Sequence, residues 1–237
     1  MLRHMSLNQY GQKLGEVLPN WQPRSLPQKT TIHGTYCRLE PIAPARHGAD
    51  LYSIHNKTND DMWWTYLLQE KPAQEVEMLV MLEEFALSSD LLHFAVVDMH
   101  SNKALGSLAL MRIDPVNGVI EIGHVNFSSS LQHTTQASEA IYLLLKYVFS
   151  DLGYRRCEWK CDNFNESSKR AALRFGFTFE GIFRQAVVTK GRNRDTSWFA
   201  IIDKQWPNRQ KGFINWLNAS NFESNGQQKS KLVFEQD

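Results

Sequence analysis

The chain has 237 residues, with 26 basic and 25 acidic side chains and a formal net charge of +1. A chain of this length buries roughly 70–75% of its unfolded surface, so it needs no disulfide to hold one large domain. The balanced charge gives no electrostatic case for a nucleic-acid partner or an anionic membrane. The N-terminus lacks the apolar core of a signal peptide and no apolar run could span a bilayer, so we expect a cytoplasmic protein.

The organisation of the chain follows from where periodic patterns begin and end. Residues 1–30 contain three prolines and little periodicity, and are predicted to form an N-terminal arm. Residues 31–206 carry the periodic segments and are predicted to form one domain. Residues 207–237 are predicted to form a short helix around Phe213 to Ala219, followed by a polar tail.

The first part of the domain reads as a strand and two helices. The strand is expected at residues 35–42, Pro44 opens the first helix, and the second helix lies within residues 71–89. The second helix has apolar residues at helical spacing, which predict its buried face: Val76, Leu79, Val80 and Leu82.

Three strands separated by hairpin turns come next, at residues 93–98, 104–113 and 118–127, and predict an antiparallel meander. A helix at 136–150 then leads to a strand at 155–162. A strand–helix–strand crossover makes its two strands parallel, and ligands bind at the carboxyl ends of such strands.

The domain ends with a helix and a hairpin. Asn165 is a good helix cap and Gly176 a good helix stop, and the strands are expected at 177–190 and 195–204 around a turn at 191–194. The whole order predicts an α+β fold: a mixed, mostly antiparallel sheet flanked by helices.

The three cysteines do not indicate a disulfide framework or a metal site. Cys157 and Cys161 lie about 13 Å apart along one predicted strand, too far for a disulfide. Their spacing misses the usual zinc pairs, and no histidine cluster completes a site. We interpret Cys37, Cys157 and Cys161 as small buried apolar residues, and we predict no metal.

Three segments together resemble the GCN5-related N-acetyltransferase (GNAT) superfamily, in particular its ribosomal-protein N-terminal acetyltransferases. They are IEIGHVNFSSSLQHTTQASEAIYLLLKYVF, LGYRRCEWKCDNFNESSKRAALRFGFTFEG and FRQAVVTKGRNRDTSWFAII. The second is the most specific, because it joins Asn-x-x-Ser, Gly-Phe and Glu-Gly in order. In the first segment, His133 and Thr135 stand where the family usually has glycines. The resemblance implies a sheet whose parallel pair splays apart at the acetyl-CoA site.

The resemblance also implies where acetyl-CoA binds. Free amides at a helix start carry partial positive charge and suit a pyrophosphate. The implied contacts come from this helix start and from the amides of the preceding strand, which would hold the pantetheine arm and thioester oxygen. They are Val125, Asn126, Gln132, Thr134, Thr135, Gln136, Ala137 and Ser138. Without the resemblance, ordinary helix capping is the simpler interpretation.

Two side chains are predicted to carry the chemistry. Glu121 could accept a proton from the acceptor amine directly or through water, or could be a solvated strand residue. Ser168 could donate to the departing sulfur and could also contact the co-substrate. Asn165 would cap its helix and add a hydrogen bond to CoA. His124 is interpreted as packed rather than catalytic.

The acceptor is predicted to bind beside the link between the first two helices. Asp60, Asp61, Trp63, Trp64 and Tyr66 form an acidic, aromatic patch there that could hold a cationic amine, or the tryptophans could simply pack the link.

The remaining expectations concern the acceptor and the class of protein. Arg112 could bind an acceptor carboxylate or be a plain surface charge. The acceptor would be a small amine or a protein N-terminus, attacked in a ternary complex by a monomer or homodimer. The alternative is a non-catalytic acyl-CoA-binding module with the same fold.

Overall fold

The computed structural model describes residues 6–56 and 61–235. The ends of the predicted arm and tail, residues 1–5 and 236–237, lie outside this part, as does Asp60 of the predicted acceptor patch. The elements are β1 (Ser6–Leu7), β2 (Lys13–Leu14), β3 (Ile32–His33), β4 (Cys37–Pro41), α1 (Pro44–Asn56), η1 (Asp61–Trp64), α2 (Glu75–Leu87), β5 (Leu91–Asp98), β6 (Ala104–Asp114), β7 (Val119–Phe127), α3 (Thr135–Lys146), η2 (Tyr147–Asp151), β8 (Arg156–Asp162), α4 (Glu166–Arg174), β9 (Thr178–Thr189), β10 (Arg192–Ile202), α5 (Trp206–Leu217) and η3 (Ala219–Asn221).

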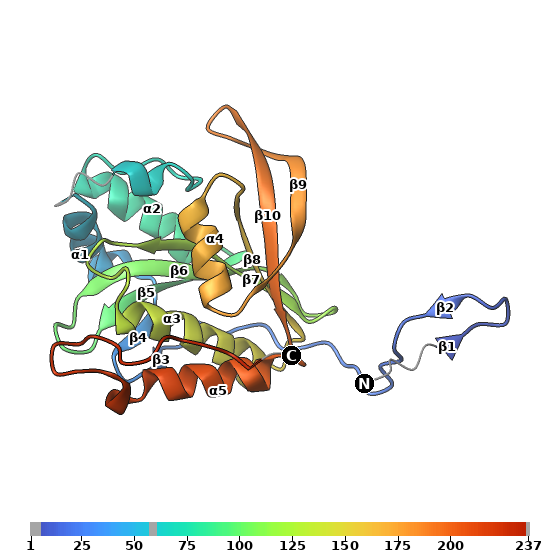
Figure 1. The fold of residues 1–237 in the computed structure, drawn as a ribbon. Coiled ribbons are helices and arrows are strands. Elements are labelled where there is room, and N and C mark those ends of the chain that lie inside the picture. Colours follow the sequence, from blue (N-terminus) through green and yellow to red (C-terminus); the bar gives the residue numbers. More distant parts are fainter. Residues whose placement is uncertain (1–5, 57–60, 236–237) are drawn as a thin grey trace.

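One eight-stranded sheet organises the molecule, in the order β3-β4-β5-β6-β7-β8-β10-β9 (Figure 1). All neighbours pair antiparallel except β7 and β8, which are parallel. This confirms the predicted α+β class and the parallel pair produced by the crossover through α3.

Helices cover the sheet in two layers (Figure 1). Alternate residues of the central strand β5 enter different cores: Phe94 and Val96 pack with α3, whereas Ala95 and Val97 pack with α1 and α2. Alternation of this kind follows from the two-residue repeat of a strand. The larger core, on the α3 side, also takes in α5 and supports the carboxyl end of β7.

The buried face predicted for α2 is right at Leu82 and wrong at Val76 and Val80. Met78, Leu82 and Phe85 are buried, whereas Val76 and Val80 are 58% and 56% exposed. Apolar residues surround most of this helix, so spacing alone left more than one possible face. Packing against α1 and β5 decided between them.

The final hairpin turns one residue earlier than predicted. Lys190 and Gly191 form the two-residue turn, with φ values of 50° and 70°. Two positive φ values are the mark of a type I′ turn, whose twist matches that of the flanking strands. β10 therefore begins inside the segment that was predicted as turn, and Lys190 at the hairpin tip reaches the link after α1.

The two ends of the chain behave differently. The β1–β2 hairpin projects from the body (Figure 1), and its residues are exposed. The C-terminal helix is longer than predicted, Trp206–Leu217, with Phe213 and Trp216 buried. Beyond it the chain folds back along the body instead of leaving it (Figure 1).

A buried carboxylate fixes α3 to the start of β4. Glu139 is 4% exposed and accepts backbone hydrogen bonds from Thr35, Tyr36 and Cys37, each 2.7 Å long. A Cβ added at Gly34 would lie 2.6 Å from this carboxyl group, so only glycine fits there. The contact sets the position of the α3 start relative to the sheet edge.

Candidate active site

The parallel pair opens where the family resemblance implied. Registered pairs between β7 and β8 run from Val119↔Arg156 to Glu121↔Glu158. A bulge follows on β7, where the register with β6 shifts and His124 takes a φ of 48°. A bulge re-aims the strand that carries it. Val125 and Asn126, just past this bulge, line a cleft of about 1100 Å³ between the two strands.

The structure brings most of the predicted residues together at this cleft. Its walls come from the end of β7, the start of α3 and the first turns of α4. The predicted residues that line it are Val125, Asn126, Gln132, Thr134, Thr135, Gln136, Ala137, Ser138, Asn165, Ser168 and Tyr66. Glu121, Asp61, Trp64 and Arg112 do not belong to this lining.

At the start of α3, Thr134 caps the helix but leaves two backbone amides without a partner. Thr134 Oγ1 accepts from the amide of Ala137 at 3.2 Å and donates to the carbonyl of Leu131, so this hydroxyl is already engaged. The amides of Thr135 and Gln136 have no acceptor within the described part of the chain. The first turn contains no acidic residue. The carboxylate of Asp98 accepts from the side chain of Gln136 at 3.0 Å and leaves both of these amides without an acceptor. Unpaired amides at a helix start suit an anion.

The loop before α3 keeps a left-handed residue without glycine. His133 has a φ of 63°, the backbone region that glycine adopts most easily. The side chain of Gln132 donates to the carbonyl of Phe127 at 2.8 Å and ties the loop to the end of β7. Ala137 and Ser138, both buried, leave the backbone of the first turn without bulky side chains over it.

Sequence reasoning missed a guanidinium at this same helix start. Arg174, at the end of α4, donates to Ser138 Oγ at 3.1 Å and lies 5.0 Å from the ring centre of Trp216. No carboxylate of the described residues pairs with it. In the sequence it reads as an ordinary basic residue of a last helical turn, which the helix dipole favours. Its approach to α3 depends on tertiary packing.

At the start of α4, Asn165 caps the helix and Ser168 contributes a side-chain hydroxyl. Asn165 Oδ1 accepts from the amide of Ser168 at 3.0 Å, as a cap does. The indole N–H of Trp159 donates to Ser168 Oγ at 2.9 Å. Because the serine oxygen already accepts from Trp159, its hydrogen is left for other partners, one of which is the Cys161 sulfur. Burial raises the pKa of the nearby Cys161 thiol, and a hydrogen bond with Ser168 opposes that shift.

Glu121 lies within a row of alternating charges, on the face of the sheet opposite to that packed against α3. Its carboxylate is 2.9 Å from Lys160 Nζ and 3.2 Å from Arg112 Nε. Lys160 also pairs with Glu158 at 2.7 Å, and Glu158 pairs with Arg156 at 2.7 Å. Burial raises the pKa of the Glu121 carboxyl against the attraction of Lys160. Arg112 is the exposed member, so it covers Glu121 from solvent.

His124 packs among rings, in line with its sequence interpretation. Its ring meets those of His93 and Phe85 edge-on, with centroids 5.2 and 5.7 Å away. Burial lowers the pKa of both histidines, that of His93 to about 3. These rings are therefore neutral near pH 7 and form part of the packing beside the bulge.

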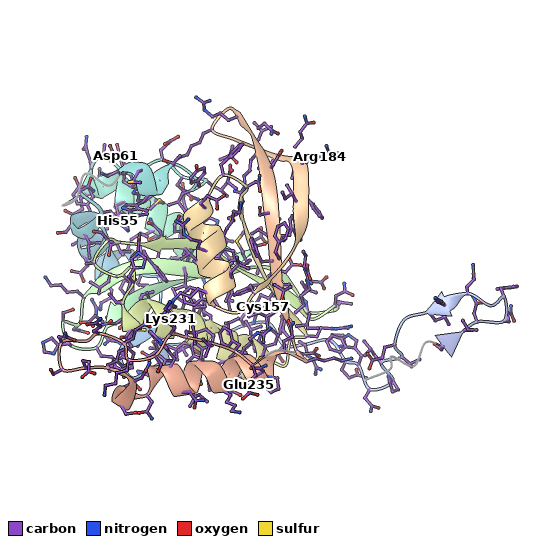
Figure 2. All side chains as sticks on the ribbon, viewed as in Figure 1. His55, Asp61, Cys157, Arg184, Lys231 and Glu235 are labelled. Carbon is purple, nitrogen blue, oxygen red and sulfur yellow. The ribbon has the colours of Figure 1, made fainter. Side chains whose placement is uncertain are left out.

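Residues of the predicted acceptor patch point in different directions. Trp64 is 3% exposed and packs edge-on against His55, whereas Trp63 and Tyr66 line the cleft. Asp61 lies on the outer side of the link (Figure 2), where its carboxylate pairs with Lys71 at 2.6 Å. The hairpin tip closes this side, since Lys190 Nζ donates to the carbonyl of Trp64 at 2.8 Å.

The C-terminal segment supplies a further wall that the sequence did not indicate. Trp216, Phe222 and residues 226–228 line the cleft next to the start of α3. Their polar, irregular sequence gave no signal for this position. The link after α1 and the C-terminal segment thus contribute to the same cleft from distant parts of the chain.

Other features of the described residues carry no competing site. Cys37, Cys157 and Cys161 are free and buried, which confirms the interpretation of the cysteines. No group of three metal-binding side chains gathers among residues 6–56 and 61–235. Within the same ranges, none of the helices has the length and apolarity to cross a membrane. A smaller polar pocket at the β9–β10 hairpin lies between Arg184 and Asp195, away from the cleft.

Comparison with known proteins now adds to this geometry. Residues 38–178 match the family model of the acetyltransferase (GNAT) domain. A crystal structure of a GCN5-related N-acetyltransferase from Brucella melitensis is 46% identical, with a TM-score of 0.89, and the match covers 91% of this chain and 97% of that one.

Two curated relatives are more distant. The ribosomal-protein-serine acetyltransferase of Escherichia coli (strain K12) is 29% identical over 166 residues, which is 67% of this chain and 89% of that protein. An uncharacterized N-acetyltransferase, p20, from Bacillus licheniformis is 26% identical over 134 residues, 56% of this chain and 75% of that protein. The family model alone spans more than half of the chain, which therefore belongs to the GNAT family and is an acetyltransferase.

Proposed function

We propose that the protein transfers an acetyl group from acetyl-CoA to a primary amine, by direct attack of the amine in a ternary complex. The observation that carries the proposal is the start of α3, where free amides and the unpaired guanidinium of Arg174 meet at the cleft. Free amides and a guanidinium that no described carboxylate pairs with suit a diphosphate. Acetyl-CoA would supply the acetyl group as an activated thioester, and its use points to action in the cytoplasm.

Successive parts of the cleft would contact successive parts of acetyl-CoA, from its diphosphate to its thioester. The amides of Thr135 and Gln136 would hold the diphosphate. Backbone amides at Val125 and Asn126, past the bulge of β7, would hold the pantetheine arm and polarise the thioester carbonyl. Ser168, whose hydroxyl hydrogen is not committed to Trp159, would donate to the departing sulfur.

The acceptor would approach past Trp63 and Tyr66 at the other end of the cleft. A primary amine arrives mostly protonated at pH 7, so a base is needed. We propose Glu121 for this role. Because the arginine that covers it is exposed, an ammonium group could take the place of Arg112 beside this carboxylate. The Escherichia coli relative is named a ribosomal-protein-serine acetyltransferase. The only amine that a serine residue can offer is a chain N-terminus, so a protein N-terminus is the first acceptor to test, ahead of small amines.

The proposal is tested by release of CoA from acetyl-CoA in the presence of a panel of amines. The panel holds peptides with different N-terminal residues, polyamines and amino sugars. We expect turnover with at least one class and formation of its N-acetyl product. Binding of CoA without turnover of any amine would contradict a catalytic role and favour an acyl-CoA-binding module.

The proposed base is tested by Glu121→Gln, which keeps the shape of the side chain but cannot take a proton. The rate near pH 7 is expected to fall by about 10²–10⁴ and to recover partly at high pH, where free amine is abundant. Glu158→Gln is the matched control, since it removes another carboxylate beside Lys160. Equal losses in both variants, with the same pH profile, would assign Glu121 to the ion network alone.

A further inference from the structure

The C-terminal segment after α5 is anchored as a fixed part of the molecule. At its far end, the side chain of Asn208 makes hydrogen bonds of 2.7 and 3.0 Å with the backbone of Glu235, which also pairs with Lys211. Figure 2 shows Glu235 beside α5. Phe234 packs on Phe213 with ring centroids 5.6 Å apart. A chain held in this way stays on the body.

The near end of the segment forms a closed turn. Phe222 pairs with Gln228 across this turn in an isolated β-bridge. The indole N–H of Trp216 donates to Gln228 Oε1 at 2.8 Å, which ties the turn to α5. The amide of Lys229 donates to the carbonyl of Asn221 at 2.7 Å and closes the base of the turn.

This turn presents an aromatic surface to the cleft. The ring of Phe222 stands edge-on to Tyr36 and to Trp216, with centroids 6.3 and 5.2 Å away. Trp216 is 6% exposed and packs against Phe222, while Phe222 itself is partly accessible. The amide side chains of Gln227 and Gln228 line the cleft beside it.

The same end of the cleft carries positive charge. Arg174 lies over Trp216 and contacts Ser138, so the aromatic surface adjoins the anion-binding start of α3. Arg170, one turn earlier on α4, also lines the cleft. An accessible ring, amide side chains and guanidinium groups next to each other match the parts of a nucleotide: base, base edge and phosphates.

We propose that the turn formed by residues 221–229 binds the 3′-phosphorylated adenosine of CoA, with the adenine base stacked on Phe222. This inference rests on the proposed function and adds a binding surface from the C-terminal segment. The turn then contributes affinity to the nucleotide end of the co-substrate and none to the thioester end. It is a binding element, apart from the residues that carry the chemistry.

The test compares Phe222→Ala with the wild type for two ligands. Loss of one base-stacking ring is expected to weaken CoA roughly tenfold in calorimetry. The KM for acetyl-pantetheine, which lacks the nucleotide, is expected to stay the same. Phe183→Ala is the control, since Phe183 is also a partly exposed ring beside a tryptophan, Trp198, at a centroid distance of 4.4 Å.

Hydrogen exchange on the wild-type protein gives an independent measurement. Adenosine 3′,5′-bisphosphate is expected to slow exchange at residues 222–228, and pantetheine is not. Equal CoA affinity in Phe222→Ala and wild type, or no protection of the turn, would overturn this inference while CoA binding elsewhere in the cleft still stands. Failure of the wild type to bind CoA at all would overturn the proposed function itself.

Discussion

The starts of helices α2 and α3 both present backbone amides, but the charged groups next to these amides differ. At α2, Glu77 Oε2 accepts from the amides of Ala73 and Gln74 at 2.7 and 3.3 Å, so the helix carries its own anion. At α3, the first turn has no acidic residue of its own, and the guanidinium of Arg174 contacts Ser138 there. Within that turn, Asp98 accepts only from the side chain of Gln136. The α2 start carries negative charge in its own first turn, and the α3 start does not.

This difference supports the proposed diphosphate site at α3 more specifically than the presence of a helix start alone. A carboxylate at a helix start contributes about 0.3–1 kcal/mol to stability, and a cation there is unfavourable. Arg174 lies beside the amides of α3, so its charge is repelled by the positive end of the helix dipole. A bound diphosphate would turn this repulsion into attraction. Substitutions at α2, α3 and α4 can remove these contributions one at a time.

Among the three helix starts, the largest effect is expected at α4, where Ser168→Ala removes a hydroxyl but no cap. The kcat value is expected to fall by about tenfold to a hundredfold with little change in CoA affinity, because the hydroxyl would act only as the C–S bond breaks. Steady-state kinetics and CoA titration measure the two quantities.

Asn165→Ala is the matched variant, since it removes the cap of the same helix. It is expected to cost about 1 kcal/mol of unfolding free energy, read from a melting curve. If the Ser168→Ala enzyme turns over like wild type but melts earlier, Ser168 is a structural residue of the helix start. Ser168 and Asn165 would then have the same kind of role.

The next effect concerns the cation that distinguishes α3 from α2. Arg174→Gln is expected to weaken CoA about tenfold, ~1.4 kcal/mol, and more at low salt, because a charge-assisted contact to phosphate is lost. Calorimetry at two salt concentrations measures this change.

Lys169→Gln is the control for Arg174→Gln. It removes the same charge from the same helix, but Lys169 already pairs with Glu166 at 2.7 Å. Similar losses of affinity in the two variants would mean that general charge attraction, and no specific contact at α3, holds the ligand.

The smallest effect is expected at the α2 start, which carries its own carboxylate. Glu77→Gln removes the anion of α2 and is expected to lower the free energy of unfolding by roughly 0.5–1 kcal/mol in a urea titration. CoA affinity should not change, because α2 does not line the cleft. A weaker affinity for CoA in this variant would show that the two helix starts are not independent.

The sequence predicted the α3 wall of the cleft because its parts are neighbours along the chain. Val125 to Ser138 form one continuous stretch, from the end of a strand into a helix. Even the departure at His133 left the loop in a left-handed conformation, with a φ of 63°. Local patterns are sufficient for a site of this kind.

The other walls could not be predicted, since their positions depend on tertiary packing. Arg174 reaches α3 only because α4 packs beside it, and Phe222 reaches the cleft only because the chain reverses after α5. Within the link after α1, the sequence did not show that Trp63 and Tyr66 would face inward and Trp64 and Asp61 would not. That choice is set by His55 and Lys71, which hold Trp64 and Asp61 in place.

The central claim, that the start of α3 binds the diphosphate of CoA, is tested most directly by giving α3 the charge that α2 already has. Calorimetry with CoA would compare Ala137→Glu and Ala137→Gln, which add similar bulk, after melting curves show that both are folded. We predict that Ala137→Glu weakens CoA by tenfold or more, ~1.4 kcal/mol, and that Ala137→Gln weakens it less. Wild-type affinity in a folded Ala137→Glu protein would contradict the placement of the diphosphate at α3.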